Sequence, residues 1–344
     1  MRSLKIVLIV AAFISVPTAF RLADADTPTG AVRAAEQGAT NTGSDRQKIV
    51  GTYRLVITET KDASGKWTPE PNFNRMGYIT YSDTGYMGVH IMPKGRTPFA
   101  NPTQPTPEEA QNAIRGYTAY FGPYAVDEKQ HFVIHQRAGQ INPTGGDYRR
   151  YLDFVGNRLI LTPGDGISKE QATRHLIWER LPNAQLSAEA KRFVGFRRLL
   201  YTDRYVEKDG KLIKHGERNE TRTGSYIIYT PTGHMMVHLM DKSGRTKWAG
   251  TTPTPEEALA TYRSYGGYFG RFTVFENAKP KYVVHNQEGT LNPGRQSDQQ
   301  RFYELNGNIL RLGGPPTIAN GESSGGHLYW ELMPPRSTAL SSTN

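Results

Sequence analysis

The sequence predicts a mainly β protein built from two tandem eight-stranded antiparallel barrels, each with one short α-helix. Three observations support this fold class: the second half of the chain repeats the first, each copy has a single helix signal, and the rest of each copy has the pattern of short strands separated by turns. The repeat period of about 150 residues is far longer than that of solenoid repeats, so each copy is expected to be a whole domain.

Matched segments follow one another in the same order in the two copies. Thr106-Pro107-Glu108-Glu109-Ala110 in the first copy recurs as Thr254-Pro255-Glu256-Glu257-Ala258 in the second. The matching positions with ionisable or aromatic side chains include Tyr78 and Tyr226, His90 and His238, Tyr120 and Tyr268, His135 and His285, and Arg150 and Arg301.

These matched segments contain the helix signals. Thr106 and Thr254 have the residue type of an N-cap, with proline at N1 and glutamate at N3, which together form a capping box. Apolar residues follow at spacings of three and four, so we expect one helix of about three turns in each copy.

Runs of β-branched and aromatic residues between turn signals predict strands elsewhere. In the first copy the predicted strands span residues 49–60, 77–82, 86–92, 122–127, 131–137, 148–155, 158–162 and 174–181. Eight largely sequential strands favour a closed antiparallel barrel, whose interior holds only side chains or one small ligand.

The first 25 residues have the pattern of a secretory signal peptide, with basic Arg2 and Lys5, an apolar run over 6–16 and a small-x-small site at Ala23-Asp24-Ala25. The short apolar run favours cleavage over an uncleaved anchor, and predicts a periplasmic or secreted protein without a stable membrane span. The expected divisions are a signal peptide at 1–25, a flexible leader at 26–46, barrel 1 at 47–182, a linker at 183–191, barrel 2 at 192–334 and a disordered tail at 335–344.

Composition excludes several classes of chemistry. The chain has no cysteine, which rules out disulfides, thiol nucleophiles and Cys-ligated zinc. The net charge is +10, but the basic residues are scattered and no nucleic-acid-binding module is present, so no nucleic-acid partner is expected. No phosphate-cradling or dinucleotide motif is present, and no cofactor is expected.

Several segments resemble the lipocalin-like domain family of bacteria and fungi, within the calycin superfamily. The resemblance covers residues 49–332 and is carried by residues 50–55, the hairpin at 77–92, residues 106–110 and 116–122, Asn142-Pro143 and Trp178-Glu179-Arg180. It implies a barrel able to hold a small apolar molecule, and it implies no particular activity. The Gly-x-Trp signature of the family is altered to Gly51-Thr52-Tyr53 and to Gly195-Phe196-Arg197, so the base of the second barrel is expected to depart from the family pattern.

The recurring polar residues are the candidate ligand-binding residues: Tyr78, His90, Tyr120, His135, Arg150, Tyr226, His238, Tyr268, His285 and Arg301. On the strand at 86–92, alternation places His90 and Met92 on one face and Val89 and Ile91 on the other, and one of these faces must line the barrel. If the His90 face lines it, His90 and His135 share a cavity. The alternative is that the histidines are hydrogen-bonded barrel residues, and that the arginines pair with carboxylates such as Glu179 and Glu331.

Two other patterns are weaker. His131/His135 and His234/His238 are four residues apart, which on a strand is about 13 Å, so neither pair can share a metal ion, and no metal is expected. Gly321-Glu322-Ser323-Ser324-Gly325 has the Gly-x-Ser-x-Gly pattern, but it lies in a glycine-rich segment before a strand, which is the wrong context for a nucleophile elbow.

The favoured function is binding of a small apolar or amphipathic molecule in one or both barrels. The first alternative is an isomerase or cyclase acting on a reactive intermediate, with His90, His135, Arg150 and Tyr120 as its candidate groups. The second is an envelope interaction module with filled barrels. Open cavities lined by His and Tyr would favour the first two functions, and interiors filled by Met and Phe would favour the third. The sequence predicts neither the ligand nor the oligomeric state.

Overall fold

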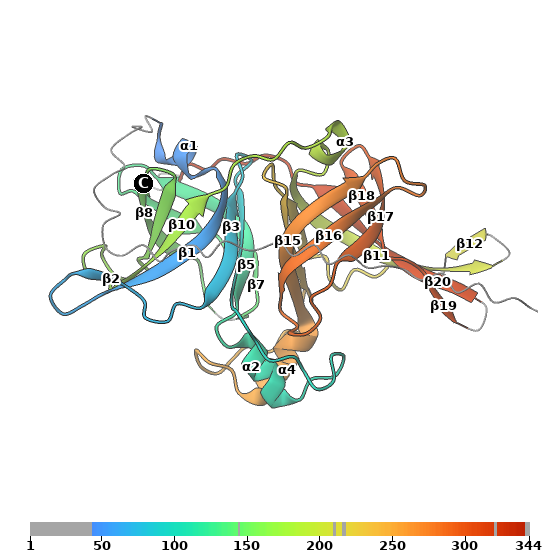
Figure 1. Cartoon of the computed structure of the whole chain (residues 1–344), viewed down its shortest axis with the longest axis horizontal. Helices are drawn as coiled ribbons and strands as arrows, with labels where there is room; N and C mark the ends of the chain where they lie inside the picture. Colours follow the sequence, from blue (N-terminus) through green and yellow to red (C-terminus); the bar gives the residue numbers. More distant parts are fainter. Residues whose placement is uncertain (1–42, 144, 209–210, 215–217, 320–321, 341–344) are drawn as a thin grey trace, which may run out of the picture. The chain divides into compact units, whose positions relative to one another are not determined.

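The computed structural model describes residues 43–143, 145–208, 211–214, 218–319 and 322–340 (Figure 1). The predicted signal peptide and most of the predicted leader lie outside these residues. Both copies belong to one compact unit of the chain.

The first copy forms a closed eight-stranded antiparallel barrel. Its strands pair in the order β1, β3, β4, β5, β6, β8, β9, β10, and β10 pairs back with β1. The bounds are β1 Gly51–Lys61, β3 Arg75–Tyr81, β4 Tyr86–Pro93, β5 Thr118–Asp127, β6 Phe132–His135, β8 Tyr148–Val155, β9 Arg158–Pro163 and β10 Arg174–Arg180. Two short strands, β2 (Trp67–Pro69) and β7 (Gly139–Gln140), pair with β1 and β5.

The second copy repeats this barrel and closes through pairing of β11 with β20. The bounds are β11 Gly195–Lys208, β13 Tyr226–Tyr229, β14 His234–Met240, β15 Tyr265–Phe275, β16 Tyr282–Thr290, β17 Gln299–Asn306, β18 Ile309–Gly313 and β20 Glu322–Leu332. Two short strands, β12 (Lys211–Lys214) and β19 (Thr317–Ala319), pair with β11 and β20. The predicted fold class is therefore confirmed.

The expected helix is α2 (Pro107–Ile114) in the first copy and α4 (Pro255–Ser264) in the second, and the two helices pack against each other. Both have the predicted capping box, since Thr106 accepts a hydrogen bond from the Glu109 amide and Thr254 accepts one from the Glu257 amide. Two further helices, α1 (Asp45–Ile49) and α3 (Ala188–Lys191), precede the first strand of each barrel. They are too short for apolar periodicity to predict them.

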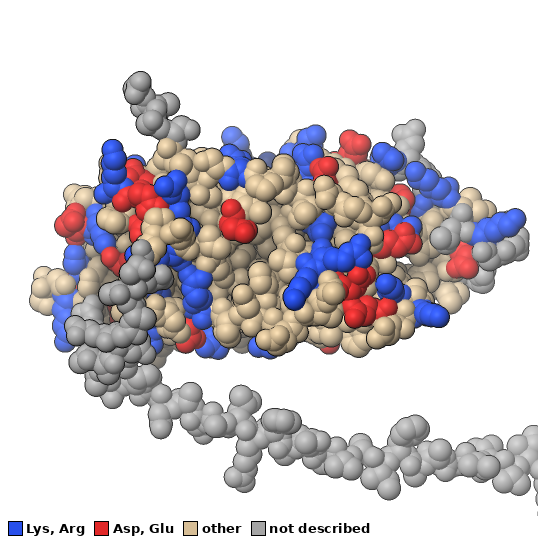
Figure 2. Space-filling model, turned by 90° about the horizontal axis from the view of Figure 1, so that it is seen from above, with Lys and Arg blue, Asp and Glu red and all other residues tan. Residues whose placement is uncertain are grey.

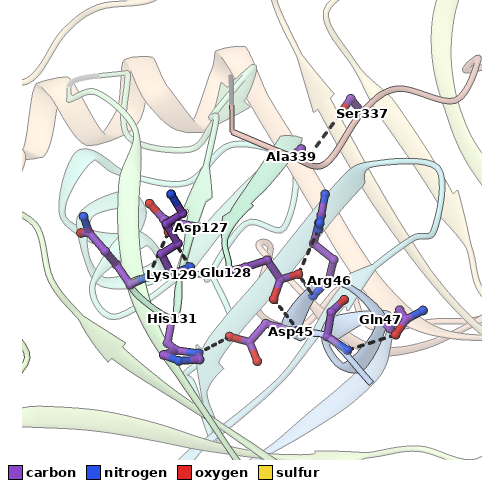
Figure 3. A network of polar contacts seen from close by, with 11 residues as sticks. Asp45, Arg46, Gln47, Asp127, Glu128, Lys129, His131, Ser337 and Ala339 are labelled. Atoms are coloured by element: carbon purple, nitrogen blue, oxygen red, sulfur yellow. Dashed lines mark hydrogen bonds and ion pairs between the residues drawn. The ribbon is translucent and has the colours of Figure 1, made fainter. Parts of the chain in front are cut away.

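The turn between β5 and β6 holds α1 in place (Figure 3). The Glu128 carboxylate accepts hydrogen bonds from the backbone amides of Asp45 at 2.9 Å and Arg46 at 3.0 Å. The His131 ring bonds to the Asp45 carboxylate at 2.7 Å, so His131 points away from the barrel interior that holds His135. A remote carboxylate thus satisfies backbone N–H groups at the start of α1 that have no partner within the helix.

Side chains fill the middle of each barrel. In the first barrel the inward-facing residues of β4 are Met87, Val89 and Ile91, which pack with Trp178 and Leu159. Equivalent residues fill the second barrel, where Trp330 is 1% exposed. Each barrel therefore has its own core, which a chain without disulfides needs.

The other face of the same strands forms a third core between the barrels. Tyr86, Met92 and Phe121 from the first barrel pack with Met236 and Phe269 from the second. The condition under which His90 would share a cavity with His135 is not met, because His90 lies on the outward face of β4 in this third core. Its ring stacks on that of His238 at a centroid distance of 4.1 Å.

Contacts across this interface are reciprocal. Phe121 packs on His238, and its equivalent Phe269 packs on His90. Arg245 donates to the carbonyls of Gln140 at 2.6 Å and Ile141 at 2.7 Å, while its equivalent Arg96 donates to those of Thr290 and Leu291. Equivalent residues meet each other only near a two-fold axis, so the duplicated barrels associate as the subunits of a symmetric dimer do, with His90 and His238 near that axis.

The C-terminal segment corrects a prediction. A disordered tail was expected over 335–344, but the described part of it, residues 335–340, lies along the first barrel. The Val126 amide donates to the Thr338 carbonyl at 2.8 Å, and the Arg336 amide donates to the Thr84 carbonyl at 3.1 Å. Main-chain hydrogen bonds of this kind require no apolar pattern, so a polar, Ser- and Thr-rich sequence does not predict them.

The surface carries both signs of charge. Basic and acidic side chains are interspersed over the face shown in Figure 2. Among the described residues, no helix has the length and apolar character required to cross a bilayer.

The base of the second barrel keeps an arginine, although its opening signature is altered. In the first barrel Arg180, on the last strand, bonds to the carbonyls of Lys48 and Val50 and covers the Tyr53 ring. In the second barrel Arg197, on the first strand, donates to the carbonyls of Arg192 at 2.8 Å and Asn308 at 2.9 Å. In the first barrel Tyr53 of β1 is paired with Arg180 of β10. In the second barrel the equivalent positions are Arg197 of β11 and Leu332 of β20, which are also paired. The arginine therefore lies on the other strand of the pair in the second barrel, at the same end of the barrel.

We predict that Arg197→Met lowers the free energy of unfolding by about 3 kcal/mol, because it leaves buried carbonyls without donors. The double change Arg197→Tyr with Leu332→Arg, which copies the first barrel, should recover most of this loss. Urea titrations measure both effects.

Arg198→Gln is the matched control. Arg198 is exposed and paired with Glu331, so its loss should cost less than about 1 kcal/mol. Equal effects of the changes at 197 and 198 would contradict the assigned role of Arg197.

Candidate functional site

The ten predicted site residues fall into two groups. Tyr78, His90, Tyr226 and His238 lie in the core between the barrels. The other six form a matching group in each barrel, and they are Tyr120, His135 and Arg150 in the first barrel and Tyr268, His285 and Arg301 in the second. The structure therefore does not bring the ten residues together in one site.

A buried histidine bridges two tyrosines inside the first barrel. The His135 Nε2 atom lies 2.8 Å from the Tyr81 hydroxyl, and its Nδ1 atom lies 3.0 Å from the Tyr120 hydroxyl. His135 comes from the end of β6, Tyr81 from the end of β3 and Tyr120 from β5. The three are inward-facing residues of strands that the barrel brings together.

The second barrel repeats this arrangement. The His285 Nε2 atom lies 2.8 Å from the Tyr229 hydroxyl, and its Nδ1 atom lies 2.8 Å from the Tyr268 hydroxyl. Each barrel therefore holds a Tyr–His–Tyr relay, defined by Tyr81, His135 and Tyr120 in the first barrel and by Tyr229, His285 and Tyr268 in the second.

Both relay histidines are neutral at physiological pH. Burial, followed by the charges of Arg150 and Arg137, lowers the pKa of His135 well below 6.5. Burial and then Arg301 lower the pKa of His285 to about 3. Burial raises the pKa of Tyr120 and Tyr268 to about 12, so both keep their hydroxyl protons.

Hydrogen-bond accounting sets the direction of each relay. Tyr81 is 1% exposed, and within the described part of the chain its hydroxyl has the His135 Nε2 atom as its one hydrogen-bond partner, so Tyr81 donates to Nε2. A neutral imidazole has one N–H, which must then be on Nδ1 and must donate to Tyr120. Tyr120 thus accepts from His135, and its own proton remains available to an outside acceptor. The same reasoning applies to Tyr229, His285 and Tyr268.

Arginines surround the outer end of the first relay. The Tyr148 ring lies between the guanidinium groups of Arg137 at 3.6 Å and Arg150 at 4.4 Å, and it packs edge-to-face on Tyr120 at 5.4 Å. Arg150 also binds Asp165 at 2.6 Å. In the second barrel Arg301 donates to the Gln299 side chain at 2.9 Å.

The expectation that these arginines pair with carboxylates holds for Arg150, which binds Asp165, but the partners named for them, Glu179 and Glu331, are wrong. Glu179 binds Arg54 at 2.7 Å, and Glu331 binds Arg198 at 2.7 Å. Both pairs lie on the outer surface of a barrel, because β1 and β10, and likewise β11 and β20, turn alternate residues outward.

A cavity of about 250 Å³ opens at the outer end of the first relay. Tyr120, Arg137 and Tyr148 line its inner part, and Gln111, Arg115 and Asn142 line its rim. Trp248 and Pro253, which belong to the second copy, complete one wall. The first cavity is therefore built from both copies of the repeat.

A second cavity, of about 310 Å³, lies at the matching place in the second barrel. Its wall includes Tyr268, Gln287, Gln299 and Asn292, the equivalent of Asn142. Its charged residues are Arg222, Arg263 and Arg295. Neither of these two cavities extends through the filled middle of a barrel.

Sequence reasoning missed several residues of these sites. Tyr81 and Tyr229 recur at matching positions among aromatic residues that could line a pocket or fill a core, but the sequence did not mark them as partners of the histidines. Arg137, Tyr148 and Trp248 have no identical counterpart, since the residue equivalent to Arg137 is Gln287 and the residue equivalent to Trp248 is Phe99. The repeat alone could not have found these three.

The weaker sequence patterns form no site in the described residues. In that part of the chain, no group of three or more His, Asp or Glu residues could hold a metal ion. Ser323 and Ser324 lie within β20, paired with β11 and β19, and not at a strand-to-helix turn.

Comparison with protein families identifies both copies. The family described as a lipocalin-like domain matches residues 50–181 and 220–333. None of the curated proteins compared with this sequence matches it significantly.

Two solved structures are similar to this chain at a low level. A protein of unknown function from Nostoc punctiforme is 11% identical, with 85% of this chain and 100% of that chain covered and a TM-score of 0.20. A candidate outer membrane protein from Bacteroides fragilis is 10% identical, with 84% and 100% covered and a TM-score of 0.22. Similarities this weak support no inference about function.

The buried neutral histidines predict a loss of stability in mild acid. Burial lowers the pKa of His90 and His285 to about 3, and the pKa of His135 and His238 is also well below 6.5. Between about pH 6.5 and 3 the unfolded chain binds protons that the folded chain does not. The free energy of unfolding should therefore fall as the pH falls through this window, by up to about 1.4 kcal/mol per pH unit for each histidine.

Guanidinium titrations near pH 7 and near pH 5 measure this dependence. The double variant His90→Gln/His238→Gln should show a clearly smaller pH dependence, because two of the four histidines that are at most 1% exposed are replaced by neutral amides. An unchanged stability of the natural protein between these two pH values would contradict the prediction.

Proposed function

This chain belongs to the lipocalin-like domain family, and on that premise we propose that it binds a small amphipathic molecule in the cavities at the ends of its barrels. The observation that carries the proposal is that one tyrosine of each relay lines a cavity. Tyr120 lines the first cavity and Tyr268 the second, and each has a proton to donate. A concave site with apolar walls and a few fixed polar groups is the usual form of a small-molecule site.

The walls of the cavities suit a ligand with one polar end. In the first cavity Ile114, Ile141 and Trp248 supply apolar surface opposite Tyr120 and Arg137. In the second, Leu239, Tyr262 and Leu291 do so opposite Tyr268. Volumes of about 250 and 310 Å³ are at or below the lower end of the range for drug-sized ligands, which favours a small molecule.

Binding is favoured over catalysis by the state of the relay. Both ring nitrogens of His135 are engaged by tyrosines, so the ring has no free nitrogen for a substrate proton. The relay residue that lines the first cavity is Tyr120, whose hydroxyl pKa of about 12 makes it a donor of hydrogen bonds and a poor acid or base near neutral pH.

The filled barrel middles favour an interaction module, but the two end cavities favour ligand binding. Tyrosines line both cavities, and no Met or Phe side chain lines either of them. We also propose that the protein acts outside the cytoplasm, in the periplasm or as a secreted protein, on the basis of the sequence pattern of residues 1–25.

Filling the cavities should abolish binding while leaving the fold intact. Thr118→Trp and Gly266→Trp introduce a bulky side chain at matching positions of the two walls. Native mass spectrometry of protein purified from its own host should show a small molecule retained by the natural protein and lost from the double variant.

Thr273→Trp is the matched control, because Thr273 is an exposed residue of β15, the strand that also carries Gly266, and it lies outside both cavities. It should retain the molecule. Retention by the double variant, or absence of any bound molecule from repeated preparations, would reject the proposal.

A further inference from the structure

We infer that the ligand of both cavities is a small organic anion, whose carboxylate accepts hydrogen bonds from Tyr120 in the first cavity and from Tyr268 in the second. This inference rests on the binding function proposed above and names the class of ligand. It follows from the positive charge of the cavity walls, from an N–H of Arg137 that has no hydrogen-bond partner among the described residues, and from the direction of the two relays.

Every charged side chain that lines either cavity is an arginine. They are Arg115 and Arg137 in the first cavity and Arg222, Arg263 and Arg295 in the second. A concave surface lined by one sign of charge concentrates ions of the opposite sign. A cationic ligand would meet repulsion at each of these walls.

Most of these arginines have no carboxylate partner within the described residues. Arg222 binds Asp241 at 2.9 Å, but the other four form no ion pair in that part of the chain. Asp147 accepts a hydrogen bond from the backbone amide of Arg137 at 3.1 Å and not from its guanidinium. These positive charges are therefore available to a bound anion.

Arg137 has a donor without a partner. Its terminal nitrogens bond to the Gln140 side chain and the Gly146 carbonyl, and its plane is fixed on the Tyr148 ring. Its Nε atom is buried and has no hydrogen-bond partner among the described residues. A buried N–H of a charged group is costly to leave unpaired, and Arg137, which lines the cavity, would be stabilised by a negative charge bound there.

The direction of the relays excludes a ligand group that donates a hydrogen bond to Tyr120 or Tyr268. Because Tyr81 donates to His135 and His135 donates to Tyr120, the Tyr120 hydroxyl offers a proton to the cavity. Reversing the relay would leave the buried Tyr81 proton without an acceptor. The ligand group that meets Tyr120 must therefore accept hydrogen bonds, and a carboxylate does so next to guanidinium groups better than a neutral group.

The test compares matched probes on the full chain at neutral pH. Isothermal titration calorimetry with trans-cinnamate and with its neutral amide, cinnamamide, separates charge from shape, and inorganic phosphate tests whether any anion suffices. A parallel set of short straight-chain carboxylates and their amides covers other shapes. We expect carboxylates to bind at least about tenfold more tightly than their amides.

Variants assign the effect to the cavities. Tyr120→Phe with Tyr268→Phe should weaken cinnamate binding by about tenfold and cinnamamide binding by less than about threefold. Because these changes disturb buried relays, Arg115→Gln at the exposed rim provides a second test, and it should weaken cinnamate binding but not cinnamamide binding. The exposed Arg54, which pairs with Glu179 outside both cavities, provides the matched control Arg54→Gln, which should change neither.

The outcomes are distinct. Equal binding of acid and amide, abolished by Thr118→Trp with Gly266→Trp, would overturn the anion assignment and leave the binding proposal standing. Phosphate binding as tight as that of the best carboxylate would overturn the organic class. Failure of every probe to bind at millimolar concentration, in a protein that still carries a molecule from its host, would overturn the carboxylate assignment alone, whereas failure with no host molecule would overturn both proposals.

Discussion

Packing of the two barrels through the outward faces of β4 and β14 is the constraint on which the rest of the structure depends. Strands alternate their side chains, so a strand that gives His90 and Met92 to the interface must give Val89 and Ile91 to its own barrel. The same contact brings α2 against α4 and places Trp248 of the second copy on the first cavity. Core, interface and cavity walls therefore follow from one arrangement.

The histidines show how position decides what a repeated residue does. His90 and His238 stack in an apolar core, where burial keeps them neutral and where they serve the contact between barrels. His135 and His285 are equally buried, but each has a tyrosine on both ring nitrogens and an arginine nearby. His90 and His238 each bond one tyrosine, Tyr117 and Tyr265, through a single ring nitrogen. In the second pair each ring bridges two tyrosines, and there its neutrality fixes the direction of a relay.

Differences between the copies are as informative as their matches. The arginine that supports the barrel base moved from position 180 on the last strand of one barrel to position 197 on the first strand of the other, because paired neighbours in an antiparallel ladder occupy nearly the same place. The carbonyls at the end of a short helix need donors, and either strand can supply them. Function at the two cavities can diverge in a similar way, since Arg137 has Gln287 as its equivalent.

The sequence by itself determined the duplication, the barrel class and the two capped helices, because strand alternation, turn residues and capping boxes are local patterns. It also marked Tyr120, His135 and Arg150, together with their counterparts, as candidates for a site. Only the tertiary structure decided which face of β4 lines the barrel. Both faces of that strand are buried, so an alternation of buried and exposed residues cannot distinguish the inner face from the outer one. It likewise decided that Tyr81 completes a relay and that Trp248 reaches the cavity of the other copy, since such contacts join residues far apart in the chain, which no local pattern encodes.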